Sequence, residues 1–219
     1  PPRSTLFPYT TLFRSRNRVS ELDLIKPMFE KFNSIVAING FNAKKGTIID
    51  ASFVKAPAQK INSEEKKELE QKGRVESWSE AKDRQKDKDA KWAKKNSKSY
   101  FGYKNHIAVD NMNKLIRMFE ITDASVHDSH MLMPLLDYSN SSRAVWADSA
   151  YFSRKSLQML DMHYFLPHIQ RRGYNHKPLT EREKQGNLTR SRVRARVEHV
   201  FGIQRSEEHT SELQSRQSI

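Results

Sequence analysis

The chain has no cysteine and no long apolar run among its 219 residues. Without cysteine it can form neither a disulfide framework nor a cysteine-ligated zinc site, and this absence is typical of a reducing compartment. Without an apolar stretch of about 20 residues it offers no segment for a membrane crossing. We therefore expect a protein of the cytoplasm with no membrane partner.

Acidic residues are also in short supply relative to basic ones. The chain has 26 Asp and Glu against 39 Lys and Arg, which gives a formal net charge of +13. A positive field of this size favours polyanionic partners and raises the rate at which they are encountered. The charge alone indicates a partner such as nucleic acid, but it does not indicate an enzyme.

The two ends of the sequence differ in origin from its middle. The string TLFPYTTLFRS at 5–15 and the string RSEEHTSELQS at 205–215 are translations of the two adapters of a short-read sequencing library. We therefore expect residues 1–15 and 205–219 to be adapter-derived and exclude them from fold reasoning. The segment 16–204 is then part of a gene product that is cut at both ends, and it keeps the basic excess.

The middle of the chain shows an alternation of helical and extended patterns. Apolar residues at helical spacing, β-branched runs and turn signals define the elements. A capping box at Thr180 and Glu183 is followed by a break at Gly186 and Asn187. Expected helices cover 20–41, 126–137, 153–161 and 190–202, and expected strands cover 46–54, 100–109, 114–122, 143–147 and 163–169.

One segment, 55–98, is unlike the rest. It carries 14 Lys and Arg against 9 Asp and Glu and few residues that suit a core. This composition predicts an inserted, mobile arm that is partly helical around 63–72. Trp78 and Trp92 are the candidates for pinning the arm to the domain, and base stacking is the alternative use of these rings.

Three acidic residues stand in unusual contexts. Asp50 and Asp148 each follow a short apolar run, and Glu198 lies within an arginine-rich helical pattern. A carboxylate at the end of a buried strand is costly unless a cation or a hydrogen-bond network awaits it. Together the three carboxylates can form an oxygen cage for Mg²⁺. Taken singly, each aspartate is more simply a turn former, and Glu198 with Arg194 an ordinary surface pair.

Five motifs in order resemble a known family, the DDE transposases of bacterial insertion sequences, in the branch called insertion-sequence-five. The resemblance covers about residues 40–204. The motifs are IIDAS at 48–52, KSYFGYKNH at 98–106, TDASVHDS at 122–129, WADSAY at 146–151 and RARVEHVFG at 194–202.

The resemblance implies an α/β, RNase H-like fold with a five-stranded mixed sheet, flanking helices, the charged insertion after the first strand and a truncated closing helix. It implies DNA transposition, with Asp50, Asp148 and Glu198 as ligands of Mg²⁺ (Mn²⁺ as a substitute) and Arg194 as their catalytic neighbour. The implied partners are insertion-sequence ends and target DNA, bound by a homodimer of the intact protein at the bacterial nucleoid. The residues expected to hold the DNA backbone are Arg171, Arg172, Lys177, Arg190, Arg192 and Arg196.

The chain departs from the family pattern around the third acid. The family often has Tyr, Arg, Glu and Lys in series, but Ser191 stands in the tyrosine position and the lysine position, 205, is already adapter sequence. We expect the truncated chain itself to be inactive. Two other functions stay open: a structure-specific Mg²⁺-dependent nuclease, which lacks strand transfer, and a non-catalytic basic DNA-binding module, which lacks affinity for divalent metals.

Overall fold

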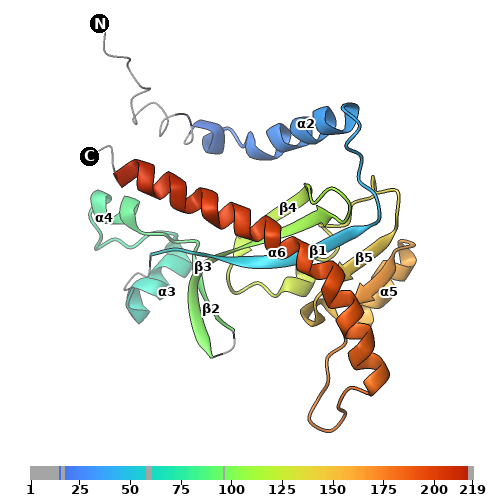
Figure 1. The fold of residues 1–219 in the computed structure, drawn as a ribbon. Coiled ribbons are helices and arrows are strands. Elements are labelled where there is room, and N and C mark those ends of the chain that lie inside the picture. The colour runs from blue at the N-terminus through green and yellow to red at the C-terminus, as the bar shows by residue number, and fades with distance from the viewer. Residues whose placement is uncertain (1–14, 16–17, 58–60, 96, 217–219) are drawn as a thin grey trace, which may run out of the picture.

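A computed structural model describes residues 15, 18–57, 61–95 and 97–216. Residues 1–14 of the leading adapter-like segment therefore lie outside the described residues. The chain folds into a mixed sheet with a long helix on one face (Figure 1). In order the elements are α2 (Ile25–Ile38), β1 (Thr47–Lys55), α3 (Ser63–Lys72), α4 (Glu80–Gln85), β2 (Lys91–Lys95), β3 (Lys98–Asp110), β4 (Ile116–Asp123), η1 (Asp128–Met131), β5 (Ala144–Ala147), η2 (Ser149–Tyr151), α5 (Arg154–Met162), β6 (Leu166–Ile169) and α6 (Glu181–Arg216).

The sheet has six strands and mixed direction. β1 lies at its centre, antiparallel to β3 and parallel to β5, and β6 continues the parallel half. β4 pairs with β3 as the predicted hairpin. The sixth strand, β2, corrects the expected count of five: it comes from the charged arm and pairs with the first residues of β3, from Lys91 opposite Gly102 to Lys95 opposite Lys98. The predicted mixed α/β fold is confirmed.

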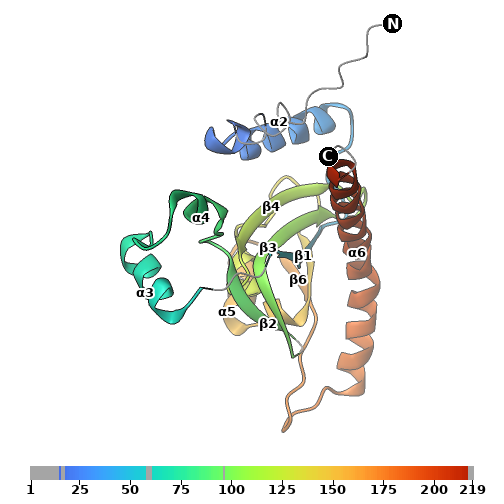
Figure 2. The same cartoon turned by 90° about the vertical axis from the view of Figure 1, so that its left-hand side faces the viewer.

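Two apolar cores lie on opposite faces of this sheet because successive side chains of a strand point to opposite sides. One face is covered by α6, and its core joins Ile48 and Ile107 to Val197 and Phe201. The other face is covered by α5 and the segment before β5, with a core that includes Ile49. Figure 2 shows α6 and α5 on either side of the sheet. None of the described helices has both the length and the apolar character that a bilayer crossing requires.

The helix predicted over 126–137 is wrong. The structure has only the short 3-10 helix η1 there, followed by turns in which Leu132 and Leu136 bond to the carbonyl three residues earlier. Pro134 cannot donate a backbone hydrogen bond and prevents a regular helix from continuing through this segment. The apolar spacing is nevertheless used, because Leu132, Leu135 and Leu136 are all buried.

The predicted break before the last helix is also wrong. The capping box between Thr180 and Glu183 is present, but α6 then runs without interruption from Glu181 to Arg216. Asn187 stays in the helix because its side-chain amide exchanges two hydrogen bonds of 2.9 Å with the backbone of Arg171. This contact outweighs the weak helical preference of the glycine–asparagine pair.

The arm is more ordered than its composition indicated. α3 has the predicted bounds, closed by a capping box at Asn62, and Trp78 is buried with its indole Nε1 donating to Glu65 at 2.7 Å. Trp92 is 56% exposed, although its ring contacts Phe101 at 5.2 Å between centroids. Trp78 therefore joins two parts of the arm to each other, and Trp92 lies on the surface of β2.

Glu65 gives this arm a defined response to acid. The hydrogen bond from Trp78, followed by that from the Asn62 backbone, lowers the pKa of Glu65 to about 2. A carboxyl whose folded pKa is depressed stabilises the fold above its ordinary pKa, and this contribution is lost as the pH falls towards the folded value. We expect the Trp78 indole resonance in nitrogen–proton spectra to keep its folded position at pH 5 and to shift between pH 4.5 and 2.

The Glu65→Gln variant should show the shifted Trp78 resonance already at pH 7. Glu70→Gln removes the same charge from an exposed position of the same helix and should leave the resonance in place. An unchanged Trp78 resonance in Glu65→Gln would contradict the role assigned to this hydrogen bond.

Candidate active site

The register of β1 and β5 places the two aspartates side by side. Asp148 directly follows β5, but Asp50 lies inside β1, which continues to Lys55, and not at the strand end that the sequence indicated. Thr47 lies opposite Val145 and Ile48 opposite Trp146, so two residues further along Asp50 lies beside Asp148. Gly46 allows this approach, because at its φ of +87° a Cβ atom would lie 2.3 Å from the Ala144 carbonyl oxygen. Any side chain at 46 would push the two strands apart and displace one aspartate from the other.

The third carboxylate comes from α6, on the same face of the sheet. Asp50 shares its face with Ile48, and Ile48 packs against Val197 of α6. Burial raises the pKa of Asp50, Arg194 and the Ala51 amide oppose that rise, and the negative charges of Asp148 and Glu198 add to it. The charges of Asp148 and Glu198 thus reach Asp50, with Asp50 buried, Asp148 half-buried and Glu198 exposed.

Arg194 connects α6 to Asp50 directly. Its Nε donates to Oδ2 of Asp50 at 3.2 Å, and its Nη1 donates to Oε1 of Gln170 at 2.8 Å. Gln170 in turn donates from Nε2 to Oγ of Ser191 at 2.5 Å. The residue that departs from the family pattern therefore takes part in a continuous hydrogen-bond chain that ends at Asp50.

Sequence reasoning missed Gln170, although one signal was present. Gln170 directly follows the last predicted strand, as Asp148 directly follows the one before it. Parallel strands bring their carboxyl ends to one edge of a sheet, so the residue after each strand is a candidate for the same site. Because Gln170 is uncharged and belongs to no motif, nothing else in the sequence indicated that it is part of the site.

The three acidic residues offer the kind of donor atom, carboxylate oxygen, that a divalent cation prefers. Ionised carboxylate oxygens are the ligands that hard divalent cations prefer, and a cation would relieve the mutual repulsion that acts on Asp50. Within the described residues, however, no three Asp, Glu or His side chains are already gathered closely enough to hold a metal ion. Arg194 bonds to one Asp50 oxygen and the Ala51 amide to the other, so the carboxylates would have to converge on the ion as it binds.

A buried ion pair lies on the other face of the sheet from Asp50, because Lys104 is three residues before Ile107, the partner of Asp50 in the register. Lys104 of β3 is 9% exposed, and its Nζ donates to Oδ1 of Asp128 at 2.8 Å and to the carbonyl of Val126 at 2.6 Å. These contacts join the second and third motifs of the sequence. They fix the start of η1 against the sheet, which is where the predicted long helix fails to form.

Tyr151 belongs to the core on the α5 face of the sheet and is affected by the charges of both Asp128 and the two aspartates. It is fully buried, and among the described residues its hydroxyl has no hydrogen-bond partner. Burial raises the pKa of Tyr151 well above its ordinary value, and the charges of Asp128, Asp50 and Asp148 raise it further. The phenol therefore stays protonated and neutral beside the carboxylates.

The residues expected to hold DNA divide into three groups. Arg171 and Arg190 border a groove of about 620 Å³ beside the first turns of α6, which is also lined by Thr180, Arg182, Glu183 and Gly186. Arg172, Lys177 and Arg192 are exposed. Arg196 already has a partner, because its Nη1 donates to the carbonyl and side-chain oxygens of Asn111 at 2.8 and 2.6 Å. It ties α6 to the turn between β3 and β4.

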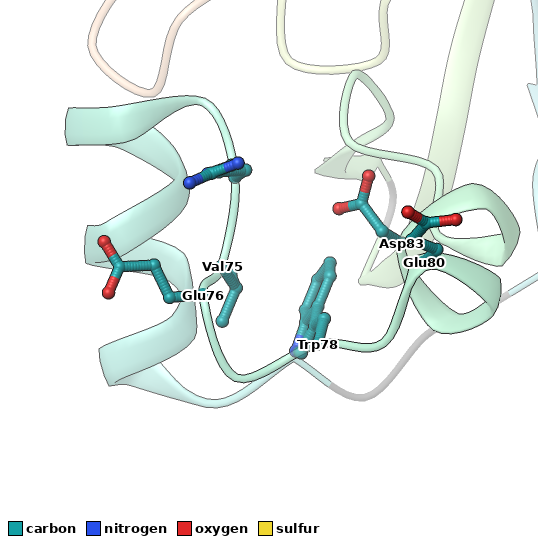
Figure 3. Close-up of a pocket in the computed structure, with 6 residues that line it drawn as sticks. Val75, Glu76, Trp78, Glu80 and Asp83 are labelled. Atoms are coloured by element: carbon teal, nitrogen blue, oxygen red, sulfur yellow. The ribbon is translucent and has the colours of Figure 1, made fainter.

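A second hollow, of about 280 Å³, lies in the arm between α3 and α4 (Figure 3). Trp78 forms its floor, and Glu76, Glu80 and Asp83 place acidic groups around it together with Arg74 and Val75. Three carboxylates against one arginine make this lining unfavourable for a phosphate. The hollow is therefore separate from the proposed chemistry at Asp50.

The strand order and the acids on two neighbouring parallel strands are consistent with the RNase H-like class of domains that process nucleic acids. The chain belongs to the transposase DDE domain family, whose model matches residues 42–207. The predicted family, a DDE transposase of an insertion sequence, is thereby confirmed. Members of this family act in DNA transposition and generally use divalent metal ions.

A curated relative agrees with this assignment. The chain is 29% identical over 191 residues to the transposase for insertion sequence element IS1106 of Neisseria meningitidis serogroup B. The match covers 86% of this chain and 64% of the relative, so the chain spans less than two thirds of that protein's length. No solved structure matches the chain.

Proposed function

We propose that this domain catalyses Mg²⁺-dependent strand cleavage and strand transfer at the ends of an insertion sequence. The observation that carries the proposal is the placement of Asp50 beside Asp148 on neighbouring parallel strands, with Glu198 and Arg194 supplied by the helix that covers the same face. A site of this kind, in a chain of net charge +13, suits a phosphodiester substrate. Mn²⁺ would replace Mg²⁺ because it accepts the same oxygen donors.

In this mechanism Asp50, Asp148 and Glu198 would hold the metal. When bound, the metal would activate water or a DNA 3′-hydroxyl as the nucleophile and neutralise the charge that develops on the leaving oxygen. Asp148 is prepared for this role because the Ala150 amide holds its Oδ1 at 2.8 Å. Arg194 would donate to a phosphate oxygen and so orient the scissile strand.

The DNA backbone would follow the groove beside α6. Arg171 and Arg190 face this groove, and Glu183 lies 3.5 Å from Arg171 as an exchangeable partner. Arg172, Lys177 and Arg192 would add charge along the same path, whereas a phosphate would have to displace Asn111 from Arg196. Such contacts give affinity without sequence readout. Because two ends of one element must be joined, we propose a homodimer with one site for each end, acting at the bacterial nucleoid.

We also propose that residues 16–204 form the partial transposase domain, with 55–98 as its charged insertion, and that 1–15 and 205–219 are translated adapter. If residues 205–216 of α6 are foreign, the chain as written should cut DNA poorly. Sequencing the gene directly from genomic DNA, without a short-read library, would show whether the adapter strings are present.

Two measurements test the proposed function. The chain should bind Mn²⁺, followed by the loss of free-ion signal in electron paramagnetic resonance, and should bind insertion-sequence-end DNA. With the gene's own sequence restored at both ends, the protein should join a 3′-hydroxyl end to plasmid DNA. DNA binding without Mn²⁺ binding would indicate a DNA-binding module, and cutting without joining would indicate a nuclease.

A further inference from the structure

Gln170 lies next to the acidic site, but the proposed transposase chemistry assigns it no role. It follows β6, and its backbone amide donates to the carbonyl of Ala147 at 3.1 Å, which places it next to the strand end that carries Asp148. On its other side it precedes Arg171, which borders the groove beside α6. Gln170 therefore lies between the acidic site and the proposed path of DNA.

Both ends of the Gln170 amide are bound, so its orientation is fixed. Oε1 accepts from Nη1 of Arg194 at 2.8 Å, and Nε2 donates to Oγ of Ser191 at 2.5 Å. Ser191 and Arg194 are three residues apart on α6 and share one face of the helix. A flipped amide would point its NH₂ group at the guanidinium, which has only donors, so Arg194 selects this orientation and the serine hydroxyl accepts from the NH₂ group that remains.

Arg194 is in this way held at two of its nitrogens. Nε bonds to Asp50 at 3.2 Å and Nη1 to Gln170, while Nη2 has no partner among the described residues. The contact to Asp50 occupies its Oδ2, an oxygen that Asp50 would use to bind the metal. A guanidinium held only by Asp50 would lose its position when that carboxylate turned towards a cation, but one held by Gln170 would keep it.

We propose that Gln170 is a positioning residue: it anchors the Arg194 guanidinium at the site so that Nη2 can bind a non-bridging phosphate oxygen of DNA. This inference rests on the proposed function and deepens it, because it assigns the ligand of Arg194 and the reason for its fixed geometry. It also gives Ser191 a role, since a small hydroxyl in the tyrosine position of the family accepts the Gln170 amide. A guanidinium whose orientation is fixed recognises phosphate better than a charged group that is free to move.

A double-mutant cycle on DNA binding tests the proposal. The affinity of this chain for a short duplex is measured at several salt concentrations for Gln170→Ala, Arg194→Ala and the double variant. Arg194→Ala should lose about tenfold in affinity, as expected for one charge-assisted hydrogen bond, and should reduce the salt slope by about 0.9. Gln170→Ala should lower the slope in the same direction although it removes no charge, and the double variant should bind no more weakly than Arg194→Ala.

A purely structural role for Gln170 would not produce this pattern. Gln185→Ala, which removes the same type of side chain from an exposed position of α6, should leave affinity and slope unchanged. Ser191→Ala is the second variant: it removes the acceptor of the Gln170 amide from the exposed surface of α6, where folding is not at risk, and should reproduce part of the Gln170→Ala loss.

The outcomes separate the two proposals. If the effects of Gln170→Ala and Arg194→Ala add in the double variant, or if both Gln170→Ala and Ser191→Ala bind DNA like the wild type, Gln170 does not act through Arg194 and the inference is overturned. If Arg194→Ala itself changes neither DNA affinity nor Mn²⁺ binding, the failure lies in the role given to Arg194 by the proposed function.

Discussion

Asp148→Asn is expected to abolish DNA cleavage while leaving DNA binding nearly unchanged. The substitution keeps the shape of the side chain, and its amide oxygen can still accept the Ala150 hydrogen bond that begins η2. It removes one negative charge from the set of carboxylates that would hold the metal, and hard divalent cations require anionic oxygen. Loss of several kcal/mol of transition-state stabilisation corresponds to a rate lower by about a thousandfold or more.

The comparison needs a gel shift and a cleavage assay on the same insertion-sequence-end DNA, in a protein with the gene's own sequence at both ends. Affinity and its salt dependence should persist, because the arginines of the groove are untouched. Asp161→Asn removes the same charge from an exposed position of α5 and should cleave normally. Cleavage by Asp148→Asn at the wild-type rate would make Asp148 a turn residue and end the triad assignment.

Asp128→Ala is expected to destabilise the fold more than any other loss of an ion pair described above. It would leave the ammonium of Lys104, which is 9% exposed, with the carbonyl of Val126 as its only bonded acceptor among the residues that the structure describes. An uncompensated buried charge costs about 3–5 kcal/mol, which for a domain of this size lowers the melting temperature by about 10 °C. Thermal unfolding followed by circular dichroism measures the change.

Two variants show whether the loss comes from the stranded charge. Replacing both partners, Lys104→Met with Asp128→Leu, should recover most of the melting temperature, because an apolar pair of similar size has no charge to desolvate. Glu120→Ala removes the partner of Lys26 from an exposed pair and should change stability by less than about 1 kcal/mol. Equal effects of Asp128→Ala and Glu120→Ala would show that burial of Lys104 does not carry the cost.

The sequence predicted the parts of the fold that depend on local pattern. The alternation around Ile48 and Asp50 defined β1, and the order of strands was enough to bring Asp50 and Asp148 together. The segment 126–137 failed because its leucines have helical spacing but are buried by a chain of turns around Pro134. β2 was missed because KWAKK has no alternating apolar face, and only its pairing with β3 makes it a strand.

Long-range contacts account for the remaining differences between the sequence predictions and the structure. Nothing near Asn187 in the sequence indicates that Arg171 will hold it in a helix, and nothing near Gln170 indicates that Arg194 will bond to it. Each contact joins residues 16 or more positions apart, so it follows from the packing of α6 on the sheet rather than from local propensity. The candidate site was therefore predictable in its charged members and not in the neutral residue between them.

The unbroken course of α6 fixes the distance between the arginines that it carries. Because α6 is one helix from Glu181 to Arg216, the separation along its axis between Arg182 at the groove and Arg194 at Asp50 is set at about 18 Å by the rise of 1.5 Å per residue. Successive phosphates along one DNA strand advance about 3.4 Å along the duplex axis. A duplex lying parallel to α6 would therefore meet these two arginines about five nucleotides apart. If Arg194 binds the scissile phosphate as proposed, the unbroken helix would set a fixed distance between that phosphate and the groove, and a helix broken at Gly186 would not fix this distance.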